Sequence, residues 1–132
     1  RLDQRVDAAE RPNLNGRLST HVLDTSAGQP AAGMWIALRE LPDYDDARLI
    51  VRLRTNTDGR TDAPLIAGRP VPIGRYELLF AVADYCAERG AALAEPPFLD
   101  VVPVRFSVAD PEGHYHVPLL VSPWSYSTYR GS

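Results

Sequence analysis

The chain has 132 residues, a length that fits one domain with its own hydrophobic core. Its composition of 45% hydrophobic and 23% charged residues is that of an ordinary soluble globular protein. Its net charge of -3, with histidine counted neutral, gives no basic patch of the kind that nucleic-acid partners require. No apolar run approaches the ~20 residues needed to cross a bilayer, so we expect neither a nucleic-acid nor a membrane partner.

The first sixteen residues, RLDQRVDAAERPNLNG, differ from the rest of the chain. They contain neither an apolar core nor a small-residue cleavage site, so they do not resemble a signal peptide. We expect residues 1–16 to be a polar extension or linker ahead of a folded domain at 17–132. The sequence begins with Arg1 rather than Met, so we expect the native start to lie upstream. The lack of a visible export signal favours a cytoplasmic over a periplasmic location.

From Leu18 onward, short apolar stretches alternate with turn residues, the pattern of a β-sandwich or barrel. One short helix is expected at 84–89, with Asp84 as its N-cap and Gly90 at its end. Pro103 favours an edge position for its strand. The pattern predicts seven or eight strands and an all-β fold, with strands over 18–24, 33–40, 48–55, 61–65, 75–84 and 101–108 and a terminal hairpin after residue 114.

The first strand carries His21. Strand parity places Ser19, His21 and Leu23 on one face, and apolar residues also occupy the opposite face. Taken alone, this position fits a satisfied interface histidine better than an acid/base group.

Arg60 closes the tight-turn sequence Asn56-Thr57-Asp58-Gly59, in which Gly59 is expected to adopt a positive φ. An arginine after such a turn is usually a solvated charge. The turn, however, fixes the arginine side chain better than a free loop would. Its planar guanidinium also matches a carboxylate or urea-like edge.

The terminal segment HYHVPLLVSPWSYSTYRGS spans His114 to Ser132. Parity puts His114 and His116 on one face, opposite an apolar face expected to join the core. His116 therefore points toward solvent or an intersubunit space, and His114, nearer the turn, is expected at the surface.

The last strand of this hairpin is expected to start at Pro123. Its alternation directs Tyr129 to the same face as Ser127, toward an intersubunit space, and Arg130 to the opposite face, where we expect it to pair with a carboxylate. The hairpin thus combines an acid/base group, a cation and the final carboxylate.

A metal site is not expected. Cys86 is the only cysteine and fits a half-buried structural thiol. The three histidines show no HExxH or similar spacing.

The segments LSTHVLDTSAGQPA, RTNTDGR and HYHVPLLVSPWSYSTYRGS, in this order, resemble the three signatures of the 5-hydroxyisourate hydrolases, the transthyretin-related enzymes of urate breakdown. The resemblance covers Leu18 to Ser132. It implies the transthyretin fold, a sandwich of two four-stranded sheets with one short helix. It also implies a homotetramer, a dimer of dimers around a central channel with active sites where two dimers face each other.

The resemblance further implies hydrolysis of 5-hydroxyisourate to 2-oxo-4-hydroxy-4-carboxy-5-ureidoimidazoline without a cofactor. The family's catalytic residues match His21, Arg60 and His116, and its terminal substrate-binding segment matches Tyr129, Arg130, Gly131 and Ser132. At the catalytic positions transthyretin has lysine, glutamate and threonine, and it lacks the YRGS ending.

Two alternatives stay open at this point. The chain could be a transthyretin-like small-molecule binding protein without catalysis, or an inactive interaction module tethered through residues 1–16. Histidines where the carrier has none argue against the first alternative. Strand parity also leaves an apolar patch beside His21 and His116, which favours an oligomer.

Overall fold

The computed structural model describes residues 16–132. The expected extension at 1–16 therefore lies, except for Gly16, outside the described residues and stays a prediction. The elements in chain order are β1 (Arg17–Asp24), β2 (Gln29–Pro30), β3 (Trp35–Leu41), β4 (Arg48–Arg54), β5 (Ile66–Ala67), β6 (Gly74–Ala81), α2 (Val82–Glu88), β7 (Val101–Val108), β8 (His114–Val121) and β9 (Tyr126–Thr128).

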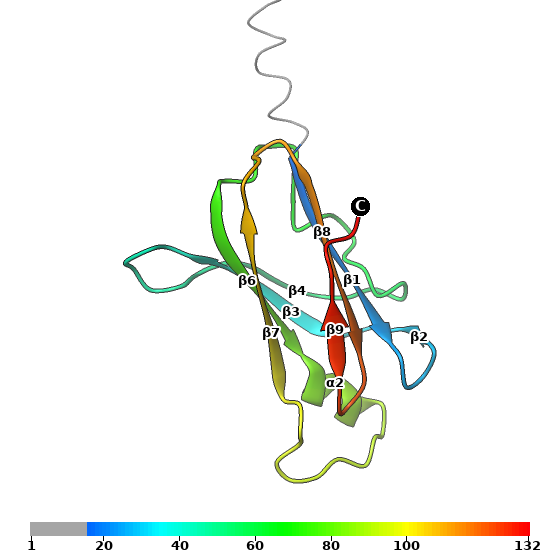
Figure 1. Cartoon of the computed structure of the whole chain (residues 1–132). Coiled ribbons are helices and arrows are strands. Elements are labelled where there is room, and N and C mark those ends of the chain that lie inside the picture. The colour runs from blue at the N-terminus through cyan, green and yellow to red at the C-terminus, as the bar shows by residue number, and fades with distance from the viewer. Residues whose placement is uncertain (1–15) are drawn as a thin grey trace, which may run out of the picture.

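Two sheets face each other as a sandwich (Figure 1). One has the order β2-β1-β8-β9, with β5 also pairing with β1, and the other has the order β4-β3-β6-β7. All pairings are antiparallel except that of β1 with β8, which is parallel. Within residues 16–132, the predicted all-β, transthyretin-like sandwich with one short helix is confirmed, and the first sheet gains a fifth member through the two-residue strand β2.

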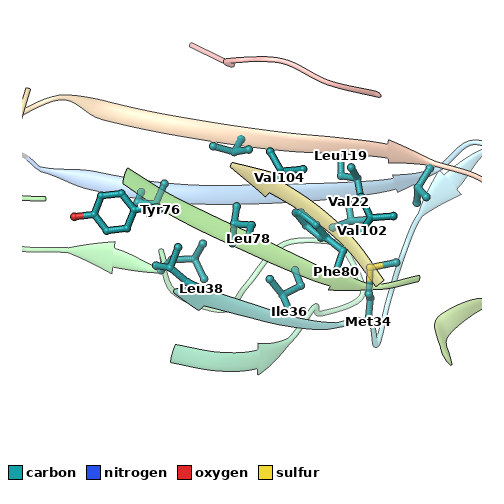
Figure 2. Close-up of a cluster of buried hydrophobic side chains, with 14 of the residues drawn as sticks. Val22, Met34, Ile36, Leu38, Tyr76, Leu78, Phe80, Val102, Val104 and Leu119 are labelled. Carbon is teal, nitrogen blue, oxygen red and sulfur yellow. The ribbon is translucent and has the colours of Figure 1, made fainter. Parts of the chain in front are cut away.

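Alternating apolar residues of both sheets fill the space between them (Figure 2). Leu18 and Val22 of β1 face inward and are fully buried, as are Leu78 and Phe80 of β6. Each such side chain stabilises the fold by about 1.5–3 kcal/mol relative to an exposed one. Because this apolar half of each strand is committed to the core, the opposite face of β1 and β8 is free to carry polar chemistry.

The helix starts two residues earlier than expected. Val82 and Ala83 are buried and begin α2, and the Ala83 N–H donates to the Asp100 carbonyl. Asp84 lies in the first turn and is not the N-cap, so that prediction is wrong. Gly90 follows the helix with φ 83°, as expected for a C-terminal glycine. Within residues 16–132, no helix combines the length and the apolar character needed to cross a membrane.

Two predicted strands also differ. Residues 61–65 form a bent loop, in which the Thr61 hydroxyl donates to the Ala63 carbonyl and the Asn56 side-chain N–H donates to the Asp62 carboxylate. Pairing with β1 occurs only at Ile66–Ala67. The last strand begins at Tyr126 and not at Pro123, because a hydrogen-bonded turn occupies 122–125. Pro103 lies on β7, an edge strand in the described chain, as predicted.

Candidate active site

The outward faces of β1 and β8 form the floor of the candidate site. The parallel register sets Ser19 opposite His116 and His21 opposite Pro118. Ser19, His21 and His116 are half-buried on this face, whereas their neighbours Leu18, Thr20, Val22, Tyr115 and Val117 are buried on the core side. The predicted parity of both strands is confirmed.

A tightly bonded turn brings Arg60 to this floor. The Asn56 side-chain oxygen accepts hydrogen bonds from the N–H groups of Asp58 (2.9 Å) and Arg60 (3.2 Å). Gly59 has φ 76°, and a Cβ there would lie only 2.3 Å from the Val22 carbonyl oxygen. Glycine therefore lets the turn dock on β1, where the Val22 N–H donates to the Gly59 carbonyl at 2.8 Å. Docking pairs Arg60 with His21 in an antiparallel bridge.

The same turn fixes the ring of His21. Its Nε2 atom lies 2.9 Å from the Asp58 carbonyl oxygen. A carbonyl only accepts hydrogen bonds, so Nε2 must carry the proton and donate it. The neutral form of His21 therefore keeps its lone pair on Nδ1.

The ring of His116 is held from two sides. Its Nδ1 atom lies 2.8 Å from the Ser19 hydroxyl oxygen. On its other side the chain returns, and the Gly131 N–H donates to the His116 carbonyl at 2.8 Å. A Cβ on Gly131 would lie 2.6 Å from the His116 Cδ2 atom, so the ring occupies space that only glycine leaves free. The Cε1–Nε2 corner is the part of the ring that neither neighbour engages.

Burial lowers the pKa of His116 below its ordinary value of 6.5, and the positive charges of Arg60 and His21 lower this pKa further. The ring is therefore neutral at neutral pH. A neutral imidazole with a free nitrogen beside an arginine is suited to accept a proton from water.

These groups border a polar pocket with a volume of about 310 Å³. The volume lies at the lower end of the range typical of small-ligand pockets. Of the predicted site residues, Arg60, His116 and Ser132 line it, and His21 is adjacent through its bridge to Arg60. The lining is completed by Arg17, Ser19, His114 and Tyr115.

Tyr129 and Arg130 lie elsewhere. Both line a second pocket, of about 330 Å³, together with Val104 and Phe106 of β7. The Arg130 guanidinium lies 4.3 Å from the ring centroid of Tyr115, and its Nη2 atom donates to the His114 carbonyl at 3.4 Å. The expected pairing of Arg130 with a carboxylate is therefore wrong for the described residues, because the ring and the carbonyl take the guanidinium instead.

Among the residues that the structure describes, no three His, Cys, Asp or Glu side chains are gathered in a way that could hold a metal ion. The site's polar groups are three imidazoles, guanidinium groups and hydroxyls. Such groups can bind a polar organic ring, move a proton and stabilise negative charge.

A sequence profile of the HIUase/Transthyretin family, named after hydroxyisourate hydrolase, matches residues 18–131. The chain belongs to this family. Within the HIUase/transthyretin family, a 5-hydroxyisourate hydrolase from Ralstonia nicotianae is 56% identical over 117 residues, covering 89% of this chain and 99% of that protein.

Two solved structures extend the comparison. The crystal structure of an (S)-allantoin synthase superposes with a TM-score of 0.85 at 45% identity; the match covers 92% of this chain but only 45% of that chain. Sea bream transthyretin in complex with thyroxine superposes with a TM-score of 0.76 at 30% identity, covering 87% and 94% of the two chains. The matched structures thus include an enzyme and a thyroxine-bound transthyretin.

Sequence reasoning did not assign a role to Ser19 or Asn56, and it did not place Arg17 or Tyr115 at this HIUase/transthyretin site. Parity already placed Ser19 on the face of His21. An asparagine at the start of a tight turn is a known signal for side-chain bonding to the backbone two residues on. Neither signal, however, tells which distant side chain is being positioned.

Proposed function

We propose that this chain hydrolyses 5-hydroxyisourate to 2-oxo-4-hydroxy-4-carboxy-5-ureidoimidazoline, a step of urate breakdown. The observation that carries the proposal is a polar pocket in which the neutral ring of His116 lies beside Arg60. The 56% identity with a 5-hydroxyisourate hydrolase over nearly its whole length supports it.

The reaction opens a cyclic amide by attack of water. In our proposal Nε2 of His116 takes a proton from the water as its oxygen bonds to the ring carbonyl carbon. Arg60 binds a polar edge of the substrate and stabilises the oxyanion that forms. The C–N bond then breaks, and the imidazolium of His116 returns the proton to the leaving nitrogen.

His21 has a separate role in this scheme. Because Nε2 donates to the Asp58 carbonyl, only Nδ1 is available to the substrate or the water. In its neutral form a ring held in this way accepts a hydrogen bond of fixed direction at Nδ1, which orients the water or a substrate N–H. Gly131 and Ser132 complete the wall of the site beside His116.

The test is the decay of 5-hydroxyisourate, generated by urate oxidase and followed by absorbance with and without the purified chain. The spontaneous decay of the substrate sets the baseline. Acceleration that disappears in His116→Asn and persists in the surface variant Ser107→Ala supports the proposal. Decay at the baseline rate together with tight substrate binding would instead favour the carrier function.

We also propose that the active form is a homotetramer, a dimer of dimers. In the described chain β7 and β9 end their sheets with unpaired edges, and such edges readily pair with another chain. The outward apolar patch is smaller than the sequence suggests, since Pro118 is buried within one chain and Leu23 and Leu120 are half-buried. Light scattering coupled to gel filtration tests this state, and a fully active monomer would contradict it.

A further inference from the structure

The Ser19 hydroxyl has one described side-chain partner, the Nδ1 atom of His116 at 2.8 Å. We propose that Ser19 is a positioning residue for the hydrolysis described above, holding Nδ1 so that Nε2 of His116 is aimed into the pocket. The proposal rests on the proposed function, but the state of the His116 ring can be measured without substrate.

The contact is built into the sheet. Ser19 and His116 are register partners in the parallel β1–β8 pair, so their side chains leave the sheet side by side on the same face. Gly131 closes the opposite edge of the ring. With Cδ2 against Gly131 and Nδ1 against Ser19, rotation of the ring would break the hydrogen bond or collide with the returning chain.

A hydroxyl suits this position chemically. When His116 is the base, Nδ1 carries the ring proton and donates it to the Ser19 oxygen, which leaves the lone pair on Nε2. The hydroxyl adds no charge. The pKa of His116 therefore stays lowered by burial and by Arg60, whereas a carboxylate in place of Ser19 would raise it.

The neighbouring residue provides a matched control. Thr20 also spans from β1 to β8, but on the core side, where its hydroxyl donates to the Val117 carbonyl at 2.7 Å. Removing either hydroxyl deletes one hydrogen bond between the same two strands. Only the Ser19 bond ends on a ring that lines the pocket.

The experiment compares Ser19→Ala, Ser19→Thr and Thr20→Val with the wild-type chain. We expect Ser19→Ala to lower kcat roughly tenfold, the worth of one hydrogen bond, with KM and the thermal midpoint little changed. Ser19→Thr restores the hydroxyl and most of the lost rate. Thr20→Val lowers the thermal midpoint and leaves kcat unchanged.

A second readout uses nitrogen NMR of the His116 ring in the free protein. We expect the wild-type and Ser19→Thr rings to carry the neutral-form proton on Nδ1, and the Ser19→Ala ring to lose this preference. An active wild-type chain with an unaffected Ser19→Ala variant would overturn the role of Ser19 alone. A covalent acyl group on Ser19, seen by mass spectrometry during turnover, would also overturn it, because Ser19 would then be a nucleophile. An inactive wild-type chain would overturn the proposed function itself.

Discussion

Gly131 and His116 occupy a space that has no room for a Cβ: an atom added to Gly131 would lie 2.6 Å from the Cδ2 atom of the His116 ring. The two residues are also joined by the backbone bond from the Gly131 N–H to the His116 carbonyl. The glycine of the YRGS segment thus sets the position of the proposed base.

Gly131→Ala is predicted to displace the His116 ring while the core stays intact. A shift of about 1 Å in a catalytic group costs on the order of 10²-fold in rate. The measurement is kcat together with the thermal midpoint. Gly28→Ala is the control for adding a methyl group, since a Cβ on Gly28 meets nothing within 4 Å. The positive φ of 68° at Gly28 means that this control variant loses some stability. Equal activity of Gly131→Ala and wild type would remove the steric role of this glycine.

The two histidines of the HYH segment are predicted to differ in importance. His116→Ala should lower turnover by ~10²–10⁴-fold, the usual loss for a positioned acid/base group. His114→Ala should be much milder, because His114 is exposed and its ring has no described hydrogen bond. Both variants should keep the wild-type circular dichroism spectrum. The reverse order of severity would show that the parity assignment does not identify the base.

The pH dependence of kcat/KM is predicted to have its acid limb below 6.5, the ordinary value of a histidine pKa. The sign follows from the neutral form being the active base: activity is lost only as the pH falls through the lowered pKa of His116. Arg60→Gln removes one of the positive charges that lower the pKa of His116, so the acid limb of this less active variant should move to higher pH. Rates between about pH 5 and 8, corrected for spontaneous decay, test both statements. An unmoved limb would show that Arg60 does not act on this titration.

Asn56→Ala is predicted to make the position of Arg60 less well fixed while leaving β1 and β8, the floor of the pocket, unchanged. The substitution removes the acceptor of the Asp58 and Arg60 N–H groups. We expect a loss of about 1–2 kcal/mol of stability from these bonds and a fall in kcat/KM of roughly tenfold. Asn56→Asp keeps the acceptor but loses the side-chain N–H that donates to the Asp62 carboxylate and places a second carboxylate there, so it should restore only part of both quantities. Denaturant unfolding and steady-state kinetics separate the two effects.

Tyr85→Phe is predicted to destabilise the fold and leave the chemistry unchanged. The Tyr85 hydroxyl donates to the buried carboxylate of Asp24 at 2.8 Å. Burial raises the pKa of Asp24, but its hydrogen bonds from Ser26, Tyr85 and Ala27 outweigh burial, and the net pKa is lowered. Leaving one carboxylate oxygen without this donor costs about 1–3 kcal/mol.

The pH dependence of this loss has a definite sign. Because the folded-state pKa of Asp24 is lowered, its stabilising contribution is present above the ordinary carboxyl pKa of 3.8 and disappears as the pH falls below it. The stability gap between Tyr85→Phe and wild type should therefore narrow in acid. A gap that stays constant down to low pH would show that the ionised carboxylate is not what the hydroxyl stabilises.

Strand parity could be predicted from sequence because the alternation in β1 and β8 is regular, and it correctly put His21 and His116 on the outward face. The helix start was missed because burial of Val82 and Ala83 outweighed the capping preference of Asp84. The contact between Ser19 and His116 depends on which strands are neighbours and in what register. No local pattern contains that information.

The group that Arg130 contacts also could not be predicted from the sequence. Parity gives the face of a side chain and not the group that it meets, and here the aromatic ring of Tyr115 and a backbone carbonyl replaced the expected carboxylate.

The parallel pairing of β1 with β8 has a consequence for synthesis on the ribosome. Ser19 and His116 are 97 residues apart in sequence, and β8 follows all four strands of the other sheet. The other sheet can assemble from hairpins and from strands that are close in sequence. Meanwhile β1 still lacks β8, its most distant partner in sequence, since contacts so distant along the chain form slowly. Until β8 emerges, β1 lacks the strand that shields its apolar residues from the side. The active-site pocket, which is built on β1 and β8, cannot form either. A nascent chain stalled after β7 should therefore be both inactive and prone to aggregate.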